Sequence, residues 1–315
     1  MTDVTVGQIG LGSMGGSVAK CLIDAGFDVV GFDISEEACD ELDEYGGEIA
    51  DSNAAVAAES DIVLTALNYP EVVKEVYLGD DGIVEGAHEG LVCIEQSTIP
   101  PEPTRELADD LDTHGIELLD APFLSGGPQF ARNGTMVLPV GGEEALYDDE
   151  DIRAVLEAMS RETHYMGPIG NGKSTKLVSN VMALGQLVLA LEAMSLGVAQ
   201  GLDSQDLFET LKYGAGSSVM FRVAVPSALN RDFAPNFPVK SSQKDLRFAL
   251  RAGEDTDFPM HVTSSILQLY TAAAASGYAD EGSGAVAKVF EEWIGDTLES
   301  DERIEVDVDD PVYTQ

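Results

Sequence analysis

The feature that most constrains the fold is a glycine-rich turn over residues 10–15 (GLGSMG), which directly follows the apolar run 4–9. The spacing GxGxxG between a strand and a helix is typical of a loop that binds the pyrophosphate of a dinucleotide. Gly10 permits the tight turn, Gly12 lets the backbone approach the phosphates, and Gly15 lets the helix pack closely on the strand. The helix N-terminus adds amide donors. A glycine-rich turn without a ligand is the alternative, and the intact strand-loop-helix context argues against it.

Short apolar runs alternate with helical segments through the first half of the chain. The expected strands are residues 4–9, 28–32, 62–66, 91–95 and 116–119, and the expected helices are 13–25, 36–45, 71–76 and 103–113. This βαβ rhythm predicts a Rossmann-type, doubly wound and mainly parallel sheet that extends to about residue 165.

Beyond Gly172 the strand-like runs disappear, and a long apolar helix from residue 173 to about 200 begins an all-helical part. We therefore expect an α/β chain with three parts. They are a dinucleotide-binding domain over 1–165, a helical substrate and oligomerisation domain over 166–300, and an acidic tail over 301–315.

The charge balance excludes one class of partner. The chain carries 57 Asp and Glu against 17 Lys and Arg, a formal net charge of −40. Nucleic acid binding is not expected, because a phosphate backbone requires a basic footprint. Periodic apolar segments separate the acidic residues, which favours a folded chain over disorder. A surplus this large, beyond what solubility requires, suggests a high-salt cytoplasm in which ions screen the mutual repulsion.

Cysteine usage and hydropathy bear on the compartment. Cys21, Cys39 and Cys93 are odd in number and form no CxxC pair, so neither a disulfide framework nor a metal site is expected. Reduced thiols fit the cytoplasm, and because no basic region precedes the first apolar run we expect no signal peptide. Residues 177–199 are apolar enough to raise the question of a membrane span, but Glu192 and two amides interrupt them. We interpret this stretch as a buried helix and expect no membrane partner.

An acidic residue closes the second strand. Asp33 lies eighteen residues after Gly15, where a carboxylate would accept hydrogen bonds from the ribose hydroxyls of the cofactor. Residues 34–37 (ISEE) offer no cation for a 2′-phosphate, so the sequence predicts NAD in preference to NADP. Capping of the following helix is an alternative role for Asp33 and is compatible with ribose binding.

The glycine-rich entry into the long helix carries the candidate catalytic residues. Lys176 and Asn180 are four positions apart and therefore share one helix face. A lysine at the start of an apolar helix costs free energy unless it has a function, so Lys176 is the candidate proton donor. Asn180 would hold the substrate oxygen through its amide. The alternative is that Lys176 extends into solvent, as we expect for Lys173.

Taken together, six segments resemble the β-hydroxyacid dehydrogenases, and within them the 3-hydroxyisobutyrate dehydrogenases and tartronate semialdehyde reductases. The resemblance spans about residues 4 to 295. It rests on residues 10–15 (GLGSMG), 67–70 (LNYP), 96–99 (QSTI), 120–122 (DAP) with 125–127 (SGG), 167–180 (GPIGNGKSTKLVSN) and 244–246 (KDL).

The resemblance implies a role for each matching residue. Lys176 is implied as the catalytic acid/base, and Asp245 as a residue that orients its surroundings. The implied substrate contacts are Ser125, Gly126, Gly127 and Asn180. The implied cofactor contacts are Gly10, Leu11, Gly12, Met14, Gly15, Asp33, Leu67, Asn68, Thr98 and Lys244, of which Lys244 is also implied to reach the substrate. The resemblance also implies a homodimer or homotetramer supported by the long helix, and an active site in the cleft between the domains.

Two departures from the family pattern bear on substrate shape. The segment from Asp120 to Ser125 is one residue longer than usual, and residues 130–132 (FAR) replace a small-residue stretch. Arg132 is a candidate for recognition of a substrate carboxylate.

The expected reaction is reversible hydride transfer between NAD and a small 3-hydroxy acid. Two alternatives stay open. One is a decarboxylating enzyme similar to 6-phosphogluconate dehydrogenase, which would need more basic residues near the motifs to hold a phosphate. The other is a non-catalytic dinucleotide sensor, in which the fold persists without the chemistry.

Overall fold

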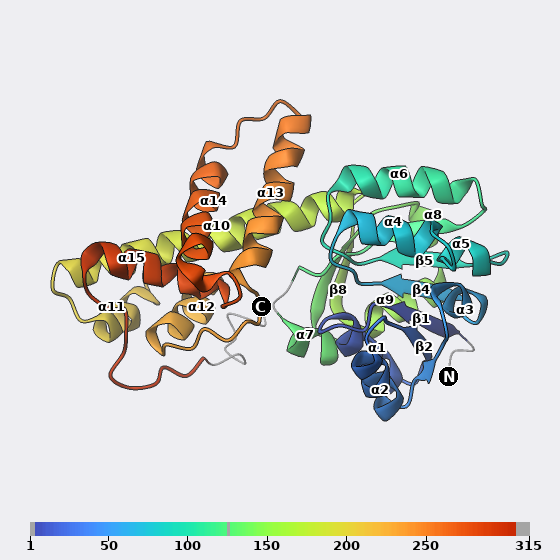
Figure 1. The fold of residues 1–315 in the computed structure, drawn as a ribbon, viewed down its shortest axis with the longest axis horizontal. Coiled ribbons are helices and arrows are strands. Elements are labelled where there is room, and N and C mark those ends of the chain that lie inside the picture. The colour runs from blue at the N-terminus through green and yellow to red at the C-terminus, as the bar shows by residue number, and fades with distance from the viewer. Residues whose placement is uncertain (1–3, 125–126, 307–315) are drawn as a thin grey trace. The chain divides into compact units, whose positions relative to one another are not determined.

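The computed structural model describes residues 4–124 and 127–306. The chain divides into two compact units, residues 1–177 and residues 178–315, which Figure 1 colours from blue to green and from green to red. Each unit has its own apolar core.

The first unit is built on a six-stranded parallel sheet. Its strands are β1 (Thr5–Ile9), β2 (Asp28–Phe32), β3 (Glu48–Ile49), β4 (Ile62–Thr65), β5 (Val92–Glu95) and β6 (Glu117–Asp120). They are arranged in the order β3-β2-β1-β4-β5-β6, and every neighbouring pair is parallel. This order is that of a dinucleotide-binding Rossmann fold, so the predicted doubly wound sheet is confirmed.

Helices cover both faces of this sheet (Figure 1). They are α1 (Gly15–Ala25), α2 (Glu36–Tyr45), α3 (Asn53–Ala58), α4 (Pro70–Leu78), α5 (Ile83–Gly86) and α6 (Pro101–Asp112). Leu64 and Ile94 join the core that contains Val18 of α1, whereas Val63 and Cys93 join the core with the apolar residues of α4 and α6. Successive strand residues point to opposite faces, so the strands are apolar throughout instead of alternating.

Three elements in this region escape the sequence pattern. Strand β3 has two residues, both exposed, so it carries no burial signal. Helix α3 is alanine-rich and α5 is a single turn, and neither shows the apolar periodicity of a longer amphipathic helix.

A second, two-stranded parallel sheet follows the six-stranded one. It consists of β7 (Met136–Val140) and β8 (Ser160–Tyr165). Helix α7 (Pro128–Arg132) precedes β7, and α8 (Glu144–Tyr147) and α9 (Glu150–Ala158) connect the two strands. Asp120 at the end of β6 forms an antiparallel bridge with Gly141, which attaches this sheet beside β6.

The second unit is helical, as predicted, over its described residues 178–306. After α10 (Asn171–Ala199) it contains α11 (Ser204–Leu211), α12 (Val219–Leu229), α13 (Val239–Asp255), α14 (His261–Ala273) and α15 (Ala287–Ile294). A π-helical turn at Ala274–Tyr278 and a 3₁₀ turn at Ser283–Val286 lie between α14 and α15.

Helix α10 forms the centre of the second core. Leu187, Leu191 and Met194 are fully buried in it. Among the described residues α10 is the one helix long and apolar enough to cross a membrane by length and composition, and half of its most apolar 18-residue window is buried. The prediction that 177–199 is a buried helix therefore holds for one side of α10.

Candidate active site

The glycine-rich loop has the geometry that its sequence spacing predicts. Gly10 has φ +84°, and its N–H donates to the carbonyl oxygen of Phe32 at 3.1 Å. A Cβ at Gly15 would lie 1.9 Å from the carbonyl oxygen of Gly10, so only glycine fits there. A Cβ at Gly12 would meet nothing within 4 Å. The loop is therefore tight where helix meets strand and open where a phosphate would approach.

Asp33 is bonded to this loop. Its Oδ2 accepts from the N–H of Leu11 at 2.7 Å, and its Oδ1 accepts from the N–H of Ser35 at 2.9 Å. The cap of α2 is Ser35, whose Oγ accepts from the N–H of Ala38. Asp33 therefore organises the loop and does not cap the helix, and its half-buried carboxylate lies at the end of β2.

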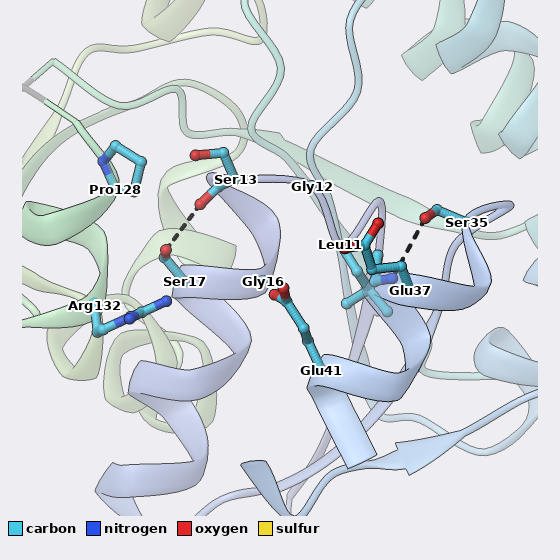
Figure 2. A pocket seen from close by; sticks show the side chains of 11 residues that line it. Leu11, Gly12, Ser13, Gly16, Ser17, Ser35, Glu37, Glu41, Pro128 and Arg132 are labelled. Carbon is cyan, nitrogen blue, oxygen red and sulfur yellow. Dashed lines mark hydrogen bonds between the residues drawn. The ribbon is translucent and has the colours of Figure 1, made fainter. Parts of the chain in front are cut away.

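A pocket of about 350 Å³ lies against the same loop (Figure 2). It is bordered by the start of α1, by α2 and by α7. Its lining residues are Leu11, Gly12, Ser13, Gly16, Ser17, Ser35, Glu37, Ala38, Glu41, Pro128 and Arg132. Met14, the remaining predicted contact of the loop, is the half-buried residue that precedes α1.

Arg132 lies at the glycine-rich loop. It lines the pocket there, and Figure 2 shows its side chain directed toward Ser17; its predicted role toward a substrate carboxylate stays a prediction. It also donates to the Tyr45 hydroxyl at 3.4 Å. No local motif signals this placement, because Arg132 is separated from the loop by more than a hundred residues of sequence.

The predicted cofactor residues after β4 and β5 lie on two loops that are bonded to each other. The N–H of Leu67 donates to Ser97 Oγ at 2.8 Å, and the N–H of Ser97 donates to Glu95 Oε1 at 2.9 Å. Asn68 is exposed and Thr98 is half-buried. Both residues follow carboxyl ends of parallel strands, which is where ligands bind in open α/β sheets.

Lys173 corrects a prediction. The sequence suggests that it extends into solvent, but its side chain is 0% exposed. Its Nζ donates to the carbonyl oxygens of Glu95 at 2.8 Å and of Ser97 at 2.7 Å, and it forms an ion pair with the Glu95 carboxylate, which is equally buried. Two of the three ammonium donors thus bond to backbone carbonyl oxygens, and the Glu95 carboxylate balances the buried charge. The signal for this pair is Glu95 itself, an acid at the end of an otherwise apolar strand.

Asp120 holds the first turn of α10 from the other side. Its carboxylate accepts from the N–H of Gly170 and from the N–H of Lys173, each at 2.6 Å. Burial raises the pKa of the Asp120 carboxyl, while Lys173 and the two backbone donors act in the opposite direction. A Cβ at Gly172 would lie 2.6 Å from Asp120 Oδ2, which explains the glycine before Lys173.

The predicted catalytic residues lie on α10. Lys176 is half-buried in the second turn, three positions after Lys173. Asn180 is 9% exposed, and its Nδ2 donates to Asp245 Oδ2 at 2.7 Å. Lys244 Nζ lies 3.5 Å from Asp245 Oδ1, so the structure brings Asn180, Lys244 and Asp245 together. Of the predicted substrate contacts, Gly127 precedes α7, and Ser125 and Gly126 lie outside the described residues.

Two family models match consecutive parts of the chain. The NAD binding domain of 6-phosphogluconate dehydrogenase matches residues 5–167. A domain described as NAD-binding of NADP-dependent 3-hydroxyisobutyrate dehydrogenase matches residues 170–290.

Individual proteins are similar over most of their length. The chain is 31% identical to 2-(hydroxymethyl)glutarate dehydrogenase of Eubacterium barkeri, over 93% of this chain and 97% of the relative. It is 35% identical to a probable mitochondrial 3-hydroxyisobutyrate dehydrogenase of Dictyostelium discoideum, over 87% and 86%. The solved structure of Mycobacterium tuberculosis 3-hydroxyisobutyrate dehydrogenase with L-serine superimposes with a TM-score of 0.83 at 30% identity, covering 91% of this chain and 98% of that one. The chain is thus a dinucleotide-binding oxidoreductase that belongs to the β-hydroxyacid dehydrogenase family.

Proposed function

We propose that this protein is a reversible, NAD-dependent dehydrogenase of a small 3-hydroxy acid similar to 3-hydroxyisobutyrate. The dinucleotide, held by the glycine-rich loop and Asp33, would supply the hydride chemistry: NAD+ would take up the hydride from the carbon that bears the hydroxyl group, and NADH would supply it in the reverse direction. Lys176 takes the hydroxyl proton during oxidation and returns it during reduction.

The observation that carries the proposal is the anchoring of α10. Lys173 bonds to the loop after β5, and Asp120 bonds to the backbone of the first helical turn. Lys176 follows one turn later on the same helix face. Because the loop after β5 also carries Thr98, this anchoring supports an amine close to the cofactor-lining residues.

Asn180 is suited to hold the reacting oxygen. Its Nδ2 has two N–H groups, one of which is donated to Asp245. We assign the other to the substrate oxygen, where a neutral donor stabilises developing negative charge. We assign the substrate carboxylate to Ser125, Gly126 and Gly127, through their backbone and the side chain of Ser125.

The preference for NAD rests on charge. A 2′-phosphate beside Asp33 would meet a carboxylate, and Glu37 and Glu41 line the adjoining pocket. Arg132 is the cation in that lining, and we assign it to the phosphates that NAD and NADP share. The description of the second family model names an NADP-dependent enzyme. The alternative that Arg132 binds a 2′-phosphate must therefore be tested.

The exposed side of α10 supports a homodimer or homotetramer. Met182, Leu189 and Leu196 are seven residues apart and 57%, 66% and 61% exposed, so they form one apolar stripe along the helix. A second copy of the same helix is complementary to such a stripe. We further propose that the assembly works in a salt-rich cytoplasm, since a net charge of −40 requires screening.

The deciding experiment follows NADH formation in about 2 M KCl, where charge repulsion is screened. NAD and NADP are offered separately with 3-hydroxyisobutyrate, 3-hydroxypropionate, glycerate, threonate and 6-phosphogluconate. We expect turnover of a short hydroxy acid with NAD. Lys176→Ala should lower kcat by a factor of about 100 to 10,000 and leave NAD binding intact.

The matched control is Lys74→Ala, which removes an exposed lysine of α4 and should leave kcat unchanged. If 6-phosphogluconate is the one substrate turned over, the proposal is wrong and the protein is a decarboxylating sugar-acid dehydrogenase. NAD binding without turnover of any substrate would replace it by a dinucleotide sensor.

A further inference from the structure

The buried ion pair of Lys173 and Glu95 connects α10 to the sheet at a cost in desolvation free energy. Both side chains are 0% exposed, and removing two charges from water costs free energy that their attraction repays only with good geometry. Replacement of a buried ion pair by apolar side chains of similar size is often neutral or stabilising in proteins. The pair is therefore better explained by the directional hydrogen bonds that it forms than by the strength of its charge attraction.

The contacts of the pair are directional on both sides. Lys173 Nζ donates to the backbone carbonyl oxygens of Glu95 and Ser97 and forms an ion pair with the Glu95 carboxylate. Glu95 Oε1 accepts from the N–H of Ser97, and Ser97 Oγ accepts from the N–H of Leu67. Every polar group of Ser97 is thus bonded, and the loops that carry Asn68 and Thr98 are fixed to the first turn of α10.

The backbone of that turn is fixed as well. Asp120 accepts from the N–H of Gly170 and from the N–H of Lys173, so the same residue, Lys173, is held by its main chain and by the tip of its side chain. A rotation of α10 about its axis would break one set of bonds or the other. Lys176 lies three positions later, on the same helix face, so it moves with Lys173.

We propose that the Lys173–Glu95 pair is a positioning device for Lys176, which fixes the rotation of α10 relative to the loops after β4 and β5. The inference rests on the proposed role of Lys176 as the acid/base. Misplacement of a reacting group by about 1 Å can lower the rate about a hundredfold. A fixed rotation of α10 therefore offsets the free energy needed to bury two charges.

The test is the double variant Lys173→Met/Glu95→Gln, assayed with both substrates saturating in molar salt. These replacements keep the side-chain volumes and remove both charges together, so neither partner is left charged and alone. We expect a folded protein whose affinity for NAD, measured by direct titration, changes by less than about threefold. We expect kcat to fall by about 10- to 100-fold, because the amine of Lys176 loses its fixed placement relative to the loops after β4 and β5.

A second measurement does not depend on turnover. Hydrogen exchange in the free protein should quicken in peptides that cover residues 95–98 and 171–176 and stay unchanged in α4. Lys74→Met, the same replacement at an exposed site of α4, is the matched control and should alter neither readout. Glu95→Asp keeps both charges and withdraws the carboxylate by one methylene, and it should lower kcat by about three- to tenfold, which provides a milder variant if the double variant unfolds.

A folded double variant or Glu95→Asp variant with wild-type kcat would overturn the inference, as would weaker NAD binding with kcat unchanged. Lys176→Ala separates this outcome from failure of the proposed function. If Lys176→Ala retains turnover, the proposed acid/base is wrong. If it loses turnover while the pair variants retain it, only the positioning role is wrong.

Discussion

The carboxylate of Asp33 accepts a hydrogen bond from the backbone N–H of Leu11 at 2.7 Å, across 22 residues of sequence. Its second oxygen accepts from the N–H of Ser35 at 2.9 Å. One side chain therefore shapes the loop that receives the phosphates and places a negative charge at the end of β2. The loop geometry and the proposed preference for NAD therefore depend on the same residue.

The Asp33→Asn variant should discriminate less between NAD and NADP than the wild type. The amide has one acceptor oxygen, so one of the two backbone N–H groups loses its partner, and the charge that repels a 2′-phosphate is gone. We expect the Kd for NAD to rise about tenfold and the ratio of kcat/KM for NADP over NAD to rise at least about tenfold. Steady-state kinetics with both cofactors measure this. Asp28→Asn, at the exposed start of β2, should leave the ratio unchanged.

Two glycines of the same loop should respond differently to alanine. Gly15→Ala places a Cβ 1.9 Å from the Gly10 carbonyl oxygen, so the free energy of unfolding should fall by about 2 kcal/mol or more. Gly12→Ala meets no atom within 4 Å, so stability should stay within about 0.5 kcal/mol of wild type. Its Cβ occupies the space of the phosphates, however, and NAD affinity should drop at least about tenfold. Urea unfolding and NAD titration check both; equal stability losses would contradict the assignment.

Arg132→Met tests the cation of the pocket. If Arg132 binds the phosphates common to both cofactors, KM for NAD and for NADP should rise together by about tenfold, equivalent to about 1.4 kcal/mol, with kcat unchanged. Arg251→Met removes an exposed arginine of α13 and serves as the control. A rise for NADP alone would assign Arg132 to the 2′-phosphate and would weaken the case for NAD preference.

Salt should stabilise the fold. The formal charge of −40 produces self-repulsion that falls as the Debye length shortens from about 10 Å at 0.1 M to about 3 Å at 1 M salt. We expect the free energy of unfolding to increase between these concentrations of KCl. The variant Asp43→Lys/Glu44→Lys, at two exposed positions of α2, should require less salt for the same stability. A salt-independent unfolding curve would refute the halophilic interpretation.

The three thiols should differ in reactivity with pH. Burial raises the pKa of the Cys93 thiol far above its usual range, and burial with the nearby Asp24 raises that of Cys21. A raised pKa lowers the thiolate fraction at a given pH, and the thiolate is the nucleophile. With a disulfide reagent at about pH 8, near an ordinary thiol pKa, we expect the partly exposed Cys39 to react first. Cys39→Ser should abolish that fast phase, and urea should release the other two thiols.

The sequence by itself determined the architecture, because architecture is encoded locally. The order of glycines in residues 10–15 and the apolar runs 4–9, 28–32, 62–66 and 91–95 predict a parallel sheet, since each signal lies within one element. The helical nature of the second unit follows in the same way. Strands β7 and β8 escaped because Pro139 interrupts the first, and the second is polar and largely exposed.

The tertiary structure alone decided how the candidate site is held. Buried Lys173 donates to the carbonyl oxygen of Ser97, which lies 76 residues earlier in the chain. Asp120, 50 residues before Gly170, caps the start of α10. Arg132 reaches the pocket of the glycine-rich loop through α7. In each case the partner of a charged group lies on a distant segment. Local periodicity carries no information about such partners, since the free energy of a buried charge depends on which atoms surround it after folding.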